Sequence, residues 1–198
     1  MEIASLGVQV HGGMGFIEET GAAQHFRDAR ITPIYEGTTG IQANDLLGRK
    51  IVRDGGKEAK RLLEEMKATA SGLQSSADLE IKAMGAGLGS AVLALERAVE
   101  WIVETFPKNA PAALAGAYPL MKSFGLVAGG WLLGKSAAIA KAKLTQGATD
   151  SFYTQKIGVA TFYTHHVLSG AAGLAQSVRV GEEVASAMQR GLNDLLTA

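Results

Sequence analysis

The sequence predicts an all-α protein built as a helical bundle. Apolar residues recur every three or four positions over most of the chain, which is the period of a helix with one buried face. No region shows the sustained apolar–polar alternation of a half-buried strand. Many of the 25 glycines lie inside alanine-rich helical segments, where they favour close approach of neighbouring helices. With 198 residues, 47% of them hydrophobic, the chain suits one or two domains with a real core.

The composition excludes several classes of protein. The 19 basic and 19 acidic side chains balance, which argues against a protein that binds nucleic acid through a basic face. Without cysteine there are no disulfides, thiolate metal sites or cysteine nucleophiles. The N-terminus lacks the basic and apolar regions of a signal peptide. The most apolar stretch, between Lys122 and Lys135, is shorter than the ~20 residues that span a bilayer. We therefore expect no transmembrane segment and a cytoplasmic location.

Two helices are predicted in the first part of the chain. The first covers Thr20–Ile31, and Pro33 helps to end it because proline disfavours helical backbone at the preceding Thr32. The second begins near Thr38, a good capping residue. It ends at Gly55-Gly56, since glycine favours helix termination.

Longer helices follow from Lys57 onward. One ends at Ser75-Ser76, and the next runs for about seven turns until Pro107. Pro119 suits the first turn of another, and Asp150 can cap the one after. The predicted helices cover 57–74, 81–106, 119–145, 150–173 and 184–195. Together they predict an antiparallel bundle, with a domain boundary that separates residues 1–56 from residues 57–198.

A glycine-rich segment, 9–16, separates the first apolar residues from the first predicted helix. A Rossmann dinucleotide loop would need a preceding strand and three glycines at set spacings, and neither is present. Taken alone, the segment indicates a tight connection between helices. The alternative is a loop of bare backbone N–H groups that could meet a phosphate.

The adjacent histidines His165 and His166 do not predict a metal site. Two ligands on one helix face need a spacing of four residues, and no carboxylate lies nearby to complete a set. We expect one ring to pack inward and the other to face solvent.

Glu36 is a lone carboxylate between two predicted helices, flanked by Tyr35 and Gly37. One interpretation is an acid placed near the N-terminus of the next helix, which the helix dipole favours by ~0.3–1 kcal/mol. The other is a general base, with Gly37 leaving room for a substrate. Considered without other residues, Glu36 is better explained by the structural role.

Three segments become informative when they are taken together: Gln9–Phe16, Phe26–Arg30 and Ile34–Thr38. In their order, spacing and residue types they closely resemble the C-terminal motifs of the acyl-CoA dehydrogenases. The resemblance covers about the first fifty residues and is specific. Residues 36–46 are similar to the branch of the family that carries an extra helical C-terminal domain, and residues 57–198 fit such a domain in length and in their helical pattern. By this resemblance, residues 1–56 are the end of the family's C-terminal helical domain, followed by an additional antiparallel bundle.

The resemblance implies that Glu36 is the catalytic base. It would remove the pro-R α-proton of an acyl-CoA thioester while the β-hydride passes to N5 of FAD, giving the trans-2-enoyl-CoA. The backbone N–H of Glu36 and a flavin ribityl hydroxyl would stabilise charge on the thioester oxygen. Gly37 matches a substrate-contact position.

The same resemblance assigns two groups of residues to FAD. The first would hold the FAD diphosphate of a neighbouring subunit, although His11 replaces a more usual apolar residue. The second group follows Glu36 in the sequence. In it, Gly40 stands where shorter members of the family commonly have a residue with an amide side chain. The first group is Gln9, Val10, His11, Gly12 and Gly13, and the second is Thr38, Thr39 and Gly40.

The resemblance further implies an oxidoreductase of fatty acid metabolism and β-oxidation. Its substrate would be an acyl-CoA, its electron acceptor an electron-transfer flavoprotein, and its assembly a homo-oligomer. Because the family's N-terminal helical domain and β-domain are not in this sequence, we expect a C-terminal fragment of a longer protein, unable to retain FAD or oxidise acyl-CoA alone. Two alternatives remain: an acyl-CoA oxidase with the same base but reoxidation by O₂, and an inactive helical interaction or oligomerisation module.

Overall fold

The computed structural model describes the backbone of residues 1–197 and the side chains of residues 1–193. The chain divides into two compact units, one of residues 1–42 and one that begins at Ala43. Helices of several kinds make up the described backbone, which contains no strand. The predicted all-α class is therefore confirmed. The domain boundary expected after Gly56 stays a prediction; it falls inside the second unit.

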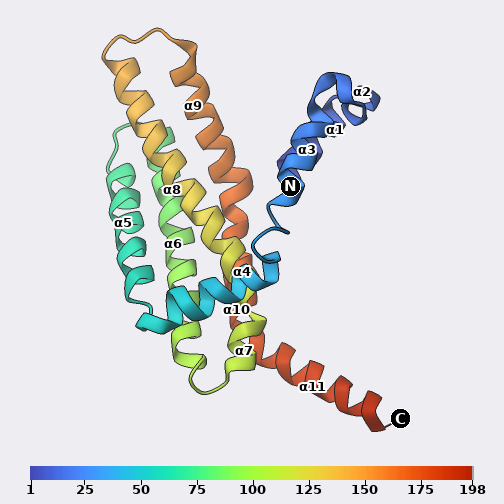
Figure 1. Ribbon diagram of the computed structural model, residues 1–198. Helices are drawn as coiled ribbons and strands as arrows, with labels where there is room; N and C mark the ends of the chain where they lie inside the picture. The colour runs from blue at the N-terminus through green and yellow to red at the C-terminus, as the bar shows by residue number, and fades with distance from the viewer. Residues whose placement is uncertain (198) are drawn as a thin grey trace. The chain divides into compact units, whose positions relative to one another are not determined.

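The first unit is a small helical hairpin in which α1 and α3 pack against each other in opposite directions (Figure 1). The prediction missed α1 and α2 as helices, because α1 is short, has no side-chain cap and buries none of its residues. Small residues fill the little interior that exists: Gly15, Ala22 and Ala23. The elements are α1 (Glu2–Val10), α2 (Gly13–Phe16), a 3₁₀ turn (Glu18–Thr20) and α3 (Ala22–Ile31).

Pro33 ends α3 in a different way from the one predicted. The helix ends at Ile31, but Thr32 keeps helical backbone angles, with φ −59° and ψ −35°. Pro33 has no N–H to donate to the carbonyl of Ala29. The Thr32 hydroxyl takes this place and donates to that carbonyl at 2.8 Å. The proline thus ends the helix by removing a donor, and not by shifting the residue before it.

The second unit is a bundle in which α5, α6, α8, α9 and α10 pack side by side (Figure 1). The short α7 connects α6 to α8, and α11 packs against α7. Leu63, Leu95, Val99, Ile102 and Leu120 are fully buried in its core. The bounds are α5 (Lys57–Gln74), α6 (Leu79–Thr105), α7 (Ala110–Ala115), α8 (Ala117–Thr145), α9 (Ser151–Phe162), α10 (Ala171–Arg179) and α11 (Gly181–Thr197).

Two helices predicted as continuous are interrupted. The helix expected from Thr38 to Gly55 is α4 (Thr39–Asp45), followed by a π-helical turn (Leu46–Ile51) and a 3₁₀ turn (Val52–Asp54). The helix expected from Asp150 to Gly173 is α9, then a π-helical turn (Tyr163–Val167), a 3₁₀ turn (Leu168–Gly170) and α10. The prediction of unbroken helices was wrong at both places.

The first interruption follows from the spacing of the buried side chains. Ala43, Leu47 and Ile51 are all buried and lie four residues apart. In an α-helix with 3.6 residues per turn, such a stripe drifts by about 40° at each step. A wider π turn reduces that drift and keeps Leu47 and Ile51 against the core.

The helix α8 is long and apolar enough to cross a membrane, with a mean hydropathy of 1.2 over an 18-residue window, and no other described helix meets these criteria. The stretch Lys122–Lys135, on which the sequence-based expectation relied, is only its middle part. The core helix of a bundle meets the same criteria, and α8 packs against α5, α6, α9 and α10. The expectation that no segment spans a membrane stays a prediction.

Asp78 ties the start of α6 to α8 through an ion pair. Its carboxylate caps α6 by accepting from the N–H groups of Glu80 and Ile81, and the ammonium of Lys141 lies 2.6 Å from it. The Lys141 hydrogen bond, followed by the Ile81 N–H, lowers the pKa of Asp78, and the same hydrogen bond raises the pKa of Lys141. The pair therefore stabilises the fold above the unfolded Asp pKa of about 3.9, and this contribution is lost as pH falls through the lower folded pKa.

We expect Asp78→Asn to lower the melting temperature at neutral pH and to weaken its decline on acidification below about pH 4. Asparagine still caps a helix, so the variant removes the ion pair alone. Thermal unfolding over a pH series checks this. Asp150→Asn is the matched control, because Asp150 caps α9 through the Phe152 N–H and forms no ion pair within the described residues. Parallel pH curves for Asp78→Asn and wild type would contradict the expectation.

Candidate active site

Glu36 has an unusual backbone conformation. Its φ is +56°, and among the described residues no other non-glycine residue has a positive φ. For an L-residue the left-handed conformation costs about 1–2 kcal/mol, because Cβ approaches a carbonyl oxygen. Such a conformation persists only where its surroundings impose it, and it is concentrated at functional sites.

Two neighbours shape the loop immediately after Glu36. The side-chain amide of Gln42 donates a 2.7 Å hydrogen bond to the Glu36 carbonyl. Gly37 follows with φ +115°, a value that L-residues rarely adopt. A hydrogen bond contributes about 0.5–1.5 kcal/mol net, which is comparable with the cost of the left-handed conformation. The loop is thus defined by a glycine and one side-chain contact.

The groups that Glu36 offers are open to a ligand. Its side chain is exposed. The preceding N–H groups of Ile34 and Tyr35 both bond to the carbonyl of Ile31. The N–H of Glu36 has no hydrogen-bond partner within the described part of the chain, so it is available as a donor. A carboxylate and a free N–H on one residue can act together on one small molecule.

The three residues after Gly37 begin α4. The hydroxyl of Thr38 accepts from the N–H of Ile41 at 3.5 Å, a long capping contact, and the Thr38 carbonyl accepts from the N–H of Gln42 at 3.0 Å. Thr39 is half-buried and Gly40 is exposed. This predicted cofactor-contact group therefore lies next to Glu36 in space as well as in sequence.

The predicted phosphate-binding segment runs from the end of α1 through a turn to the start of α2, as expected for a connection between helices. Gly12 has φ +60°, and beyond the adjoining backbone no heavy atom of the described residues lies within 4 Å of where a Cβ of Gly12 or Gly13 would stand. The Nδ1–H of His11 donates to the Gly7 carbonyl at 3.0 Å, which leaves Nε2 for another partner. The residues of this turn are thus compatible with a diphosphate group that approaches bare backbone.

A pocket of about 450 Å³ in the first unit includes Gln9 in its lining. At its edge, Arg27 forms a two-pronged ion pair with Glu18 at 2.8 and 2.7 Å. The Arg27 hydrogen bond lowers the pKa of Glu18, and the same contact raises the pKa of Arg27. Sequence reasoning used Arg27 only as part of a motif and did not identify this pair.

The structure does not bring the two predicted groups together within one chain. The glycine turn lies at one end of the α1–α3 pair, and the Glu36 loop follows the other end of α3 (Figure 1). The ten residues of α3 span about 15 Å. This separation accords with the resemblance, which assigns the glycine turn to the FAD of a neighbouring subunit.

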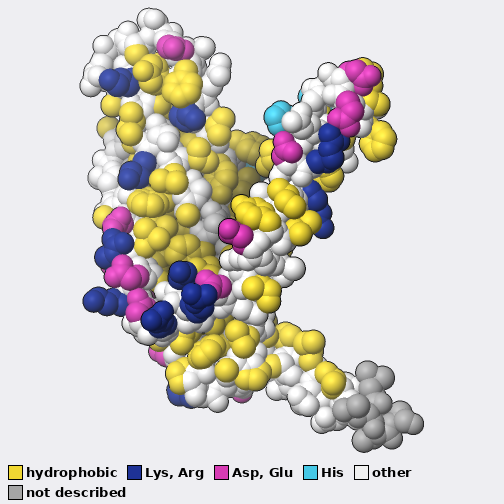
Figure 2. All heavy atoms as spheres, in the orientation of Figure 1, with side chains coloured by type: hydrophobic (Ala, Val, Ile, Leu, Met, Phe, Trp, Pro, Cys, Tyr) yellow, Lys and Arg dark blue, Asp and Glu magenta, His cyan; other side chains and the backbone are white. Residues whose placement is uncertain are grey.

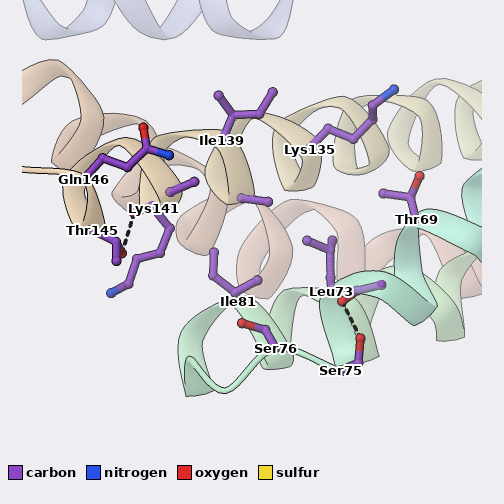
Figure 3. A pocket seen from close by; sticks show the side chains of 13 residues that line it. Thr69, Leu73, Ser75, Ser76, Ile81, Lys135, Ile139, Lys141, Thr145 and Gln146 are labelled. Carbon is purple, nitrogen blue, oxygen red and sulfur yellow. Dashed lines mark hydrogen bonds between the residues drawn. The ribbon is translucent and has the colours of Figure 1, made fainter. Parts of the chain in front are cut away.

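A pocket of about 670 Å³ lies in the second unit between α5, α6 and α8, and none of the predicted site residues lines it. In Figure 3, Leu73 and Ile81 extend toward α8, while the ammonium of Lys135 points away from them. Hydroxyl groups at its edge bond to the chain itself, as when Ser75 donates to the carbonyl of Gly72.

The adjacent histidines lie on the surface of the second unit. Both His165 and His166 are exposed, so the prediction that one ring packs inward was wrong. The His166 ring instead lies on Phe162, with ring centroids 4.8 Å apart. No group of three or more potential ligands is found in the described part of the chain.

The chain matches known families over most of its length. Residues 1–51 match the family described as acyl-CoA dehydrogenase, C-terminal domain, and residues 62–189 match the one described as acetyl-CoA dehydrogenase C-terminal like. It is 47% identical over 168 residues to 3-methylmercaptopropionyl-CoA dehydrogenase of Ruegeria pomeroyi, covering 85% of this chain and 28% of that protein. It is 33% identical over 176 residues to broad-specificity linear acyl-CoA dehydrogenase FadE5 of Mycobacterium tuberculosis, covering 81% and 28%.

A shorter match lies in the human mitochondrial short-chain specific acyl-CoA dehydrogenase, with 55% identity over 40 residues, 20% of this chain and 10% of that protein. The chain spans 28% of the length of the two relatives that it matches over most of its own residues. The family matches and these relatives agree with the resemblance found in the motifs. The chain therefore belongs to the acyl-CoA dehydrogenase family and carries C-terminal domains of that family.

Proposed function

We propose that this chain supplies the catalytic base of an FAD-dependent acyl-CoA dehydrogenase. One observation carries the proposal: Glu36, the residue that the family resemblance assigns as base, has a left-handed backbone conformation in a loop where Gln42 bonds to its carbonyl. A strained loop at an exposed carboxylate is typical of a functional site. An acid that served only to cap the next helix would not need this conformation.

Glu36 would act on the substrate through two of its groups. Its carboxylate takes the α-proton of the acyl-CoA thioester and ends protonated. Its N–H, which has no partner within the described residues, donates to the thioester oxygen as negative charge develops there. Gly37 has no side chain, which leaves room for the thioester beside the carboxylate.

FAD would be the cofactor of the whole enzyme. When bound, it supplies the acceptor for the β-hydride, so that removal of the proton and hydride leaves a trans-2-enoyl-CoA. The chain's own part is to hold it: the turn from Gln9 to Gly13 would contact its diphosphate, and Thr38, Thr39 and Gly40 would contact it after the base. The open space above Gly12 and Gly13 supports the first contact.

We further propose a homo-oligomer as the working assembly and an electron-transfer flavoprotein as the electron acceptor. The first unit supports the oligomer, because Ile3, Val10 and Phe16 are each at least 80% exposed. Apolar side chains are visible on the surface of this unit in Figure 2. Exposed apolar surface of this kind marks contact with other protein.

The test is acyl-CoA oxidation by the whole protein that contains this chain. We expect bound flavin to be reduced on mixing with an acyl-CoA under anaerobic conditions, with release of the enoyl-CoA, and an electron-transfer flavoprotein to reoxidise it. The absence of flavin reduction with acyl-CoA substrates of every chain length would contradict the dehydrogenase. Rapid oxygen consumption coupled to turnover would instead favour an oxidase.

The 198-residue chain by itself gives a separate prediction. We expect it neither to retain FAD nor to oxidise acyl-CoA, because the resemblance places the flavin ring pocket on domains that this sequence does not contain. The visible absorbance of the purified chain after incubation with FAD and desalting checks this. Stoichiometric flavin on the chain would contradict it.

A further inference from the structure

The side chain of Gln42 reaches back from α4 to the loop that carries Glu36. Its amide donates to the Glu36 carbonyl at 2.7 Å, across six residues of sequence. The contact is made to the backbone of Glu36 and leaves the carboxylate free. It therefore fixes the peptide group after Glu36, and with it the Cα that carries the side chain, beside the first turn of α4.

The hydrogen bond fixes the peptide group that joins Glu36 to Gly37. The carbonyl of Glu36 and the side chain of Gln42 both follow the N–Cα bond of Glu36 in the chain, so rotation about that bond moves acceptor and donor together. The bond depends instead on the backbone from Gly37 onward, where φ of Gly37 is +115°. Because the Cα of Glu36 belongs to the fixed peptide group, the bond sets the place from which the Glu36 side chain extends.

Gly37 is part of the same arrangement. A Cβ on Gly37 would stand 3.1 Å from Cγ2 of Ile41 and 3.4 Å from the amide nitrogen of Gln42. A side chain there would crowd the donor that holds Glu36. Gly37 therefore has a second role beside leaving room for a substrate.

We propose that Gln42 is a positioning residue for the catalytic base. Through its bond to the Glu36 carbonyl it fixes the Cα of Glu36, from which the carboxylate and the free N–H both extend toward the thioester. The proposal rests on the function proposed for Glu36. It assigns a role to a residue that the motif comparison left without one.

The first test uses two variants in the whole enzyme. Gln42→Met keeps the length of the side chain and is neutral but cannot donate, and Gln42→Glu keeps its shape but, once ionised, can only accept. We expect both to lower kcat roughly 3- to 10-fold, in proportion to one lost hydrogen bond, and to leave KM for the acyl-CoA unchanged. Gln24→Leu is the control, since Gln24 is exposed on α3 and its side chain bonds to no described residue.

The second test needs no reaction. In the 198-residue chain, the backbone chemical shifts of Gly37 report the conformation of the segment that the bond closes. We expect Gln42→Met to move them, and Gln24→Leu to leave them in place. Unchanged shifts in Gln42→Met would overturn the proposal.

The outcomes separate this proposal from the function on which it rests. If Glu36→Gln abolishes turnover while Gln42→Met turns over like wild type, positioning by Gln42 is overturned and the function stands. If Gln42→Glu lowers kcat and Gln42→Met does not, the added negative charge explains the change. This result also overturns the positioning role of Gln42. If Glu36→Gln stays active, the catalytic role of Glu36 and the positioning role both fall.

Discussion

Glu36→Gln is expected to lower kcat of the whole enzyme by about 10²- to 10⁴-fold, the usual contribution of a positioned general base. Glutamine has nearly the same shape, and the contacts that hold this loop are made by the Glu36 carbonyl, Gly37 and Gln42. The variant therefore removes the proton acceptor and keeps the loop. The measurements are the steady-state rate with an acyl-CoA and the exchange of its α-proton with deuterated solvent.

The control for this experiment is Glu19→Gln. Glu19 is an exposed glutamate in the first unit and forms no ion pair within the described residues, so its replacement should leave the rate unchanged. Turnover by Glu36→Gln within a factor of a few of wild type would remove Glu36 as the base. Retained α-proton exchange in a variant that no longer turns over would do the same, since another group would then be taking the proton.

Gly85→Ala is expected to destabilise the second unit by about 1–3 kcal/mol, the cost of overpacking a tight contact. A Cβ on Gly85 would stand 2.5 Å from the backbone nitrogen of Gln74 and 2.8 Å from the carbonyl oxygen of Ala70. Backbone atoms cannot rotate out of the way as a side chain can. Accommodating one methyl group would therefore require α5 and α6 to move apart along their contact.

The matched control, Gly125→Ala, is expected to change the free energy of unfolding in the opposite direction. Gly125 lies in the interior of α8, and apart from the backbone of that helix no heavy atom of the described residues lies within 4 Å of where a Cβ would stand. Gly125→Ala should stabilise the fold by about 0.5–1 kcal/mol, because alanine loses less backbone entropy in a helix. Urea unfolding of both variants measures the difference. Equal stabilities would show that close approach at Gly85 contributes nothing to the bundle.

The fold was predictable where the apolar period is long. The helices α5, α6 and α8 were predicted to within two residues at most of their ends, because each keeps one apolar stripe over many turns. The short elements were not predicted correctly. The helix α1 has no buried stripe to reveal it, and the π turn at Leu46–Ile51 is a response to packing that a regular helical period does not contain.

The candidate site divides in the same way. Motif order and spacing were enough to select Glu36, Gly37 and the glycine turn. They could not select Gln42, whose only local signal is its place six residues after Glu36 in the first turn of the next helix. A hydrogen bond from a side chain to a distant carbonyl depends on how the chain turns between them, and residue types alone do not specify that path.

The sequence by itself determined the all-α class, the long helices of the bundle and the family to which the chain belongs, because these depend on periodicity and on residue types at set spacings. Tertiary structure alone decided the left-handed backbone of Glu36 and its bond to Gln42. It also decided which glycines bring helices together, as at Gly85, and which stand open, as at Gly125. The physical reason is that strain and close contact arise between atoms that the fold brings together, and no local pattern records them.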